Sequence, residues 1–175
     1  MIGHEIHGKK IGIAGMGRIG KEIILRSNAF GMRTFSYDEY IDKEFTSVNN
    51  VHVCYSLQEL ISQVDILSLN MSLNDDNYHC IDKDLILNHV KEGLLLVNTA
   101  RGELVEEQAI LYGLDNDILA GYVTDVMDNE PIKKNHPYTK YKNVLITPHI
   151  GSRTIQSVER QGLLAVKNLI NNISL

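Results

Sequence analysis

Seven short apolar runs recur along the chain, and each of them has a glycine or a polar side chain at or near its end. Most of these runs are separated by stretches with helical spacing of apolar residues. Strands that alternate with helices predict a parallel sheet, because a parallel neighbour is reached only through a crossover connection. The pattern therefore predicts a doubly wound α/β fold. The runs, in chain order, are KIGIAG, RTFSYD, VHVCYS, DILSLN, LLLVNTA, LAGYVTDV and VLITPH.

The spacing of apolar residues predicts helices at 18–29, 57–63 and 104–114. A longer amphipathic helix is expected at 153–173, and its apolar stripe needs a surface to cover. No internal repeat or linker interrupts the chain, so we expect one domain over 1–175 with this helix at its end. The residues that share the apolar face of the last helix are Ile155, Val158, Val166, Leu169 and Ile173.

Composition restricts the classes of function. The chain has 175 residues, of which 43% are hydrophobic and 22% charged, with no apolar run near the roughly 18 residues of a membrane helix. The first ten residues do not resemble a secretory signal, so we expect a soluble, cytoplasmic protein without a membrane partner. A net charge of −5 without clustered Lys or Arg argues against a nucleic-acid partner. The spacing of Cys54 and Cys80 indicates neither a disulfide framework nor a metal site.

Candidate chemistry gathers where the predicted strands end. In open parallel sheets, ligands bind outside the carboxyl ends of the strands, because helix N-termini point there. We therefore expect the side chains at these ends to lie along one edge of the sheet. They are Gly15 to Gly20, Asp38, Asn70, Asn98, Arg101, Asp125, Glu130 and His149.

The glycines after the first run match the dinucleotide-binding pattern G-x-G-x-x-G. Gly15 allows a tight turn, Gly17 allows a pyrophosphate to approach the backbone, and Gly20 allows the helix to pack on the strand. Asp38 lies 18 residues beyond Gly20, at the end of the second run, where an acid accepts hydrogen bonds from the adenosine ribose. Its charge would repel a 2′-phosphate, so the pattern favours NAD over NADP. The alternative is a structural turn followed by a surface Asp.

Four motifs in order carry a more specific resemblance: GKKIGIAGMGRIGKEI, LLLVNTARGELVEEQAI, DVMDNEP and ITPHIGS. From about Gly3 to about Leu169 the chain resembles the nucleotide-binding domain of the D-isomer-specific 2-hydroxyacid dehydrogenases, the family of phosphoglycerate dehydrogenase. The resemblance implies that Arg101 binds the substrate carboxylate and carbonyl. It further implies that Glu130 partners His149, the proton donor, and that Asp125 holds the nicotinamide carboxamide.

The implied reaction is hydride transfer between NAD(H) and a 2-keto or D-2-hydroxy acid. A guanidinium is a flat fork of donors that matches a carboxylate, and a carboxylate beside an imidazole favours its protonated form. Taken singly, Arg101 could be a surface charge, Glu130 part of an ordinary turn and His149 a loop histidine. The expected cofactor-binding residues are Gly15, Gly17, Arg18, Ile19, Gly20, Asp38, Asn70, Thr99 and Asp125, and no metal site is expected.

Two departures from the family pattern bear on function. Asn70 begins a stretch that reads Asn-Met-Ser-Leu-Asn where the family often has His-x-Pro-Leu-Thr, whereas Glu130 separates the chain from the formate dehydrogenase branch, which has Gln there. Family members carry about a hundred residues before the glycine turn, which form most of a substrate domain. We therefore expect this chain to bind NAD(H) and to turn over keto acids poorly. The alternative is a non-catalytic NAD(H)-binding regulatory module of the corepressor type, and a homodimer is a candidate assembly for either function.

Overall fold

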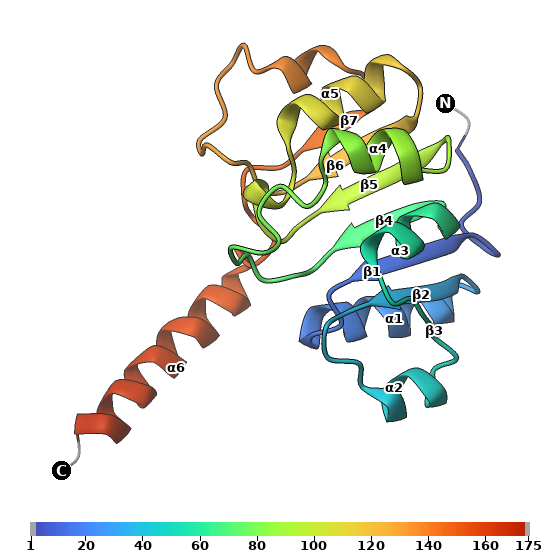
Figure 1. The fold of residues 1–175 in the computed structure, drawn as a ribbon. Helices are drawn as coiled ribbons and strands as arrows, with labels where there is room; N and C mark the ends of the chain where they lie inside the picture. Colours follow the sequence, from blue (N-terminus) through green and yellow to red (C-terminus); the bar gives the residue numbers. More distant parts are fainter. Residues whose placement is uncertain (1–2, 174–175) are drawn as a thin grey trace.

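The fold is known from a computed structural model, which describes residues 3–173. Seven parallel strands form one sheet in the order β3-β2-β1-β4-β5-β6-β7 (Figure 1). The order runs outward in both directions from the pair β1 and β4, which makes this pair the switch point of a doubly wound sheet. The strands are β1 (Lys10–Ala14), β2 (Arg33–Tyr37), β3 (His52–Val53), β4 (Ile66–Leu69), β5 (Leu94–Asn98), β6 (Leu119–Thr124) and β7 (Val144–Ile146).

Helices connect the strands and cover both faces of the sheet (Figure 1). Side-chain oxygens of Asp42, Ser56 and Asp82 accept a backbone N–H at three helix starts, which satisfies donors that a helix leaves free. The helices are α1 (Arg18–Ala29), α2 (Lys43–Val48), α3 (Leu57–Gln63), α4 (Lys83–His89), α5 (Glu107–Asp115) and α6 (Ile155–Ile173), with 3₁₀ turns η1 (Gly102–Leu104) and η2 (Pro137–Lys140).

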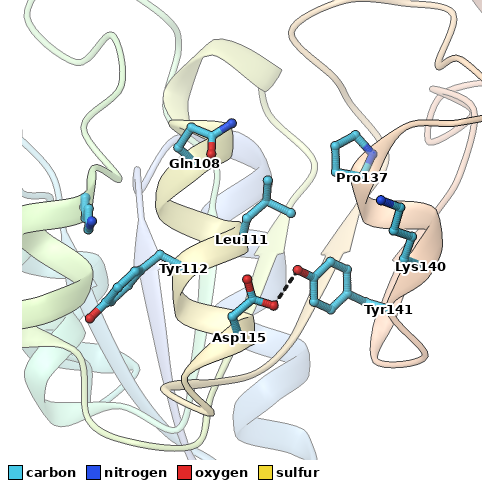
Figure 2. Close-up of a pocket in the computed structure, with 8 residues that line it drawn as sticks. Gln108, Leu111, Tyr112, Asp115, Pro137, Lys140 and Tyr141 are labelled. Carbon is cyan, nitrogen blue, oxygen red and sulfur yellow. Dashed lines mark hydrogen bonds between the residues drawn. The ribbon is translucent and has the colours of Figure 1, made fainter.

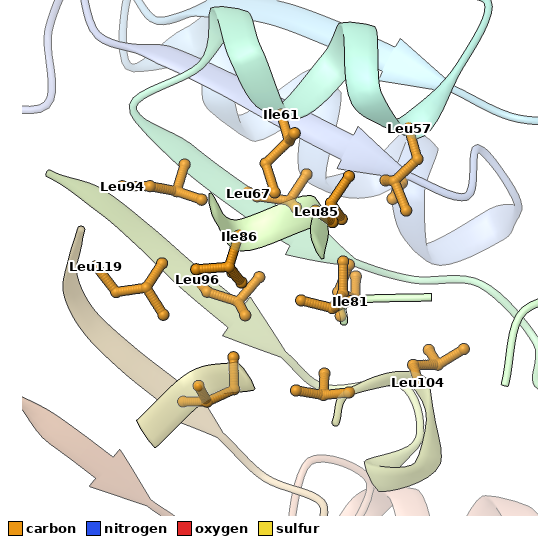
Figure 3. Close-up of a cluster of buried hydrophobic side chains, with 14 of the residues drawn as sticks. Leu57, Ile61, Leu67, Ile81, Leu85, Ile86, Leu94, Leu96, Leu104 and Leu119 are labelled. Atoms are coloured by element: carbon orange, nitrogen blue, oxygen red, sulfur yellow. The ribbon is translucent and has the colours of Figure 1, made fainter. Parts of the chain in front are cut away.

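Two clusters of buried apolar side chains hold the layers together. The larger lies between the sheet and α3, α4 and α5, where Leu67, Ile86 and Leu96 are fully buried (Figure 3). The smaller packs α1 on the other face through Ile13 and Ile24. Burying such a side chain contributes about 1.5–3 kcal/mol, so this core fixes the sheet whose edge carries the candidate site.

The structure confirms the doubly wound α/β fold and all seven predicted strands, although β3 is reduced to two residues. The predicted start of the helix at Leu104 is wrong, because Gly102–Leu104 is a 3₁₀ turn and α5 begins at Glu107. Val105 instead forms a parallel bridge with Ile81, whose backbone accepts from Glu106 N. That pairing joins distant parts of the chain, so local periodicity does not reveal it.

The helix predicted at 153–173 forms as α6 from Ile155 to Ile173 and projects away from the sheet (Figure 1). None of its residues is buried, and Ile155 is 84% exposed. The sheet therefore does not cover the apolar stripe of this helix. Within 3–173, no helix is both long and apolar enough to cross a membrane.

Candidate functional site

The glycine turn between β1 and α1 has the geometry of a phosphate cradle. Gly15 has a φ of +97°, and a Cβ on it would lie 2.7 Å from the backbone of Asn70. A Cβ on Gly20 would lie 2.1 Å from the carbonyl oxygen of Gly15. A Cβ on Gly17 would meet nothing within 4 Å. Two of the glycines are thus required by the fold, whereas the third leaves open space where a ligand can approach the backbone.

Gly17 is also the N-cap of α1, which makes this open space a helix N-terminus. The first N–H groups of a helix lack partners within it and carry partial positive charge. No acidic side chain lies in the first turn to compete for them. Arg18 and Ile19 are exposed there, with Ile19 at 66%. The residues present therefore fit a dinucleotide whose pyrophosphate lies against this turn.

Asp38 follows β2 and is tied to the same turn. Its Oδ2 accepts from Met16 N at 2.6 Å and its Oδ1 from Tyr40 N at 2.8 Å. A carboxylate has about four acceptor positions, so these bonds leave room for hydroxyl groups of a ribose. The predicted ribose acid therefore also orders the glycine turn, which the sequence pattern does not indicate.

Asn70 follows β4 on the other side of the turn. Its backbone N–H donates to Ala14 O at 2.7 Å, and its side-chain amide donates to both oxygens of Ser68 at 3.1 Å. Among the described residues, its Oδ1 is the one buried side-chain N or O atom without a hydrogen-bond partner. The structure places the predicted residue at the switch point, beside Gly15.

Asn98, the last residue of β5, shapes the turn that carries Thr99 and Arg101. It is fully buried, with its Oδ1 accepting from Ala100 N at 3.1 Å and its Nδ2 donating to Arg101 O at 2.8 Å. The Arg101 side chain donates to Ala100 O at 2.6 Å and is otherwise exposed, as is Thr99. The sequence places Asn98 at this edge of the sheet without assigning it a role, and the structure shows that its side chain holds the turn.

Asp125 follows β6 and organises the turn after β7. Its Oδ1 accepts from Thr147 Oγ1 at 2.5 Å and from Ile150 N at 2.9 Å, and its Oδ2 accepts from Gly151 N at 2.8 Å. Burial raises the pKa of Asp125, but these hydrogen bonds and the nearby His149 outweigh it and hold the pKa below its usual value. The carboxylate is therefore ionised at neutral pH.

His149 lies within the turn that Asp125 holds, at a φ of +51°. Its Nδ1 lies 2.9 Å from Glu130 Oε2 and 3.1 Å from Oε1. Glu130 Oε1 also accepts from Met127 N at 2.9 Å, and this bond followed by the contact with His149 lowers the pKa of Glu130. The ionised carboxylate at Nδ1 leaves Nε2 as the ring nitrogen free to exchange a proton with a ligand.

The loops that carry Arg101 and Glu130 are packed together. A Cβ on Gly102 would lie 2.1 Å from the backbone carbon of Met127, so the two loops meet at van der Waals contact. Glu130 and His149 are in direct contact, whereas no hydrogen bond described within 3–173 joins the Arg101 guanidinium to either. All predicted site residues follow strands at one edge of the sheet. In that range no cluster of three His, Cys, Asp or Glu could hold a metal ion.

Comparisons with known proteins agree with this geometry. Residues 1–151 match the family model described as "D-isomer specific 2-hydroxyacid dehydrogenase, NAD binding domain". The chain is 36% identical over 173 residues to a glyoxylate reductase of Thermofilum pendens, covering 97% of this chain and 50% of that protein. It is 33% identical over 167 residues to a D-3-phosphoglycerate dehydrogenase of Methanocaldococcus jannaschii, covering 95% and 32%.

Solved structures of dehydrogenases also have the fold of this chain. A glyoxylate reductase from Paecilomyes thermophila superposes with a TM-score of 0.90 at 33% identity, covering 99% of this chain and 52% of that one. The holo form of D-mandelate dehydrogenase from Rhodotorula graminis gives 0.89 at 28% identity, covering 95% and 48%. The chain thus spans about half the length of these two structures and of the glyoxylate reductase above.

Proposed function

The chain belongs to the D-isomer specific 2-hydroxyacid dehydrogenase family, as its NAD-binding domain, and from this we propose that it serves hydride transfer between NAD(H) and a D-2-hydroxy acid or 2-keto acid. The observation that carries the proposal is the contact of His149 Nδ1 with Glu130, at 2.9 Å. This pair lies on the sheet edge that also carries the glycine turn. The names of the relatives given above do not favour the non-catalytic alternative.

When bound, NADH would supply the hydride for the carbonyl carbon of a keto acid, and NAD⁺ would accept the hydride from the hydroxyl-bearing carbon in the reverse direction. Arg101 orients the substrate through the substrate's carboxylate, since the residue is exposed and a guanidinium has further donors besides the one bonded to Ala100 O. His149 gives a proton from Nε2 to the carbonyl oxygen in reduction and takes it back in oxidation. Glu130 holds the ring by Nδ1 and stabilises the imidazolium. The general acid–base assistance by His149 is worth about 10² to 10⁴ in rate.

Each cofactor contact follows from the position of its residue. The pyrophosphate would approach the backbone at Gly17, with Arg18 and Ile19 beside it and Gly15 and Gly20 shaping the turn. Asp38 would accept from the adenosine ribose. The remaining proposed contacts, nearer the nicotinamide, come from Asn70, Thr99 and Asp125.

A fluorescence titration with NADH tests the cofactor part of the proposal, and NADPH serves as the comparison ligand. We expect NADH to bind more tightly, because Asp38 repels a 2′-phosphate. Absence of binding at millimolar NADH would refute it. Oxidation of NADH with glyoxylate, pyruvate and other 2-keto acids then tests the chemistry. In a complete enzyme that contains this domain, substituting Asn for His149 should remove turnover and leave NADH affinity unchanged, whereas equal loss of both would show that His149 has a structural role.

The 2-keto acid substrate class and the homodimer stay predictions. Static light scattering of the chain with and without NADH tests the homodimer, whose expected mass is twice the 19.7 kDa of one chain. A cytoplasmic location also stays a prediction, based on composition alone.

A further inference from the structure

Two neighbouring loops that leave the sheet carry proposed catalytic side chains. One carries Arg101 and leads into α5, and the other carries Glu130 and leads into η2. Six residues beyond Arg101 stands Glu107, and six residues beyond Glu130 stands His136. The side chains of these two residues meet, with His136 Nε2 lying 2.8 Å from Glu107 Oε2. The contact joins the far ends of the two loops.

Between the loops, packing is incomplete. A pocket of about 310 Å³ separates them, lined by Val105 and Glu106 from one loop and by Met127 and Asn129 from the other. The loops touch closely at the sheet end, where Gly102 lies against the backbone of Met127. Beyond that contact, the buried Tyr138 of η2 packs on the core, but the space between Glu106 and Asn129 is open. The Glu107–His136 contact therefore limits how far the loops can separate.

A second pocket, of about 410 Å³, continues between α5 and η2 (Figure 2). Gln108 lines both pockets, whereas Glu107 and His136 line only the first. The second pocket is bridged by a hydrogen bond from Tyr141 to Asp115, at 2.7 Å. Two side-chain contacts thus tie α5 to the segment that follows Glu130, and the one through Glu107 is the nearer to Glu130 along the chain.

The hydrogen-bond partners of His136 distinguish its two ring nitrogens. Tyr138 N donates to His136 Nδ1 at 3.3 Å, so Nδ1 acts as an acceptor and the ring proton is on Nε2. Nε2 then donates to the Glu107 carboxylate. A ring rotated by 180° would present carbon atoms to both partners. The His136 side chain is 16% exposed and the Glu107 side chain 41% exposed, so water shields this hydrogen bond in part.

We propose that Glu107 and His136 are positioning residues, which fix the Glu130 loop against the Arg101 loop and so keep Glu130 on the ring of His149. The inference rests on the proposed roles of Glu130 and His149. Neither Glu107 nor His136 touches the substrate in this account. They act on the reaction only indirectly, because they set the position of the Glu130 carboxylate against the His149 ring.

The chain labelled with ¹⁵N-histidine tests this proposal by NMR. The Nδ1–H signal of His149, assigned by its loss in His149→Asn, reports the hydrogen bond to Glu130. In Glu107→Ala we expect the ratio of molecules with the His149–Glu130 hydrogen bond to molecules without it to fall about three- to tenfold. This factor corresponds to one net hydrogen bond. Glu107→Gln should restore the signal, because its amide oxygen still accepts from Nε2. Tyr141→Phe is the matched control, since it removes the other contact to α5 and should leave the signal unchanged.

An unchanged His149 signal in Glu107→Ala overturns the proposal, as does an equal change in Tyr141→Phe. If Glu107→Ala fails to fold, Glu107→Asp takes its place, because it shortens the reach by one methylene and should weaken the signal in the same way. NADH titration of each variant separates this result from the proposed function. Failure of the unaltered chain to bind NADH counts against that function, whereas the His149 signal alone decides the role of Glu107.

Discussion

Replacing Gly17 by Ala should abolish tight NADH binding without harming the fold. A Cβ at this position meets no atom within 4 Å, and the φ of −69° is accessible to alanine. An N-cap alanine costs several tenths of a kcal/mol relative to glycine, while the less flexible unfolded chain returns about 0.4–1 kcal/mol. The two effects nearly cancel. The free energy of unfolding should therefore stay within about 1 kcal/mol, or about 4 °C in Tm.

The effect on the ligand is different, because the methyl group fills the space in which a pyrophosphate meets the N-terminus of α1. Losing one hydrogen bond to a charged group costs about 1.5–3 kcal/mol, which raises the Kd for NADH about ten- to a hundredfold. Fluorescence titration measures the Kd, and circular dichroism measures the Tm of the same samples. Gly20→Ala should behave oppositely and lose stability, because its Cβ would lie 2.1 Å from Gly15 O.

Gly162→Ala is the matched control for the added methyl group. Gly162 lies in α6, and a Cβ there also meets nothing within 4 Å. This variant should bind NADH as the unaltered chain does and gain slightly in stability from helix propensity. Unchanged NADH affinity in Gly17→Ala, or a fall in its Tm well beyond 4 °C, would refute the assignment of this turn to the pyrophosphate.

Three further changes test other parts of the edge. Asp38→Ala should weaken NADH binding about tenfold and reduce the preference over NADPH, and an unchanged ratio of the two Kd values would contradict the ribose role. Asp125→Asn should lower the free energy of unfolding by about 1–3 kcal/mol, because an amide leaves donors of the turn after β7 unpaired, and chemical denaturation measures the loss. The folded chain lowers the pKa of both Asp125 and Glu130, so their contribution to stability is present above the unfolded values of about 4 and is lost as pH falls through the folded values. The denaturant concentration at the midpoint of unfolding should therefore fall when the pH is lowered below about 4. The fall should be smaller in Asp125→Asn. Equal falls in the two proteins would refute the contribution of the Asp125 carboxylate.

The fold and the edge of the sheet are predictable because both depend on local pattern. Each apolar run is short and ends in a polar residue, and a parallel sheet brings such ends to one side. Arg101, Glu130 and His149 follow three neighbouring strands, so the order of strands alone places their loops close together. The motifs supplied the roles that spacing could not.

What could not be predicted are pairings between distant segments. The bridge of Ile81 with Val105 delays the start of α5, and it depends on a backbone contact over 24 positions. The position of α6 could not be predicted either, because its apolar stripe predicts a covered face but does not indicate which surface covers it. The contact of Glu107 with His136 also joins residues that no local pattern connects.

Each acid of this edge holds a loop in addition to its proposed role in binding or catalysis. Asp38 accepts from Met16 N, Asp125 from Ile150 N and Glu130 from Met127 N, so each carboxylate also builds a loop. Loss of activity in an alanine variant would therefore not separate chemistry from loop order. Glu130→Gln separates them, because its amide oxygen can still accept from Met127 N while the negative charge beside His149 is gone. If the charge acts in proton transfer, this variant should keep the loop and the NADH affinity, and its rate should fall most where His149 must be protonated.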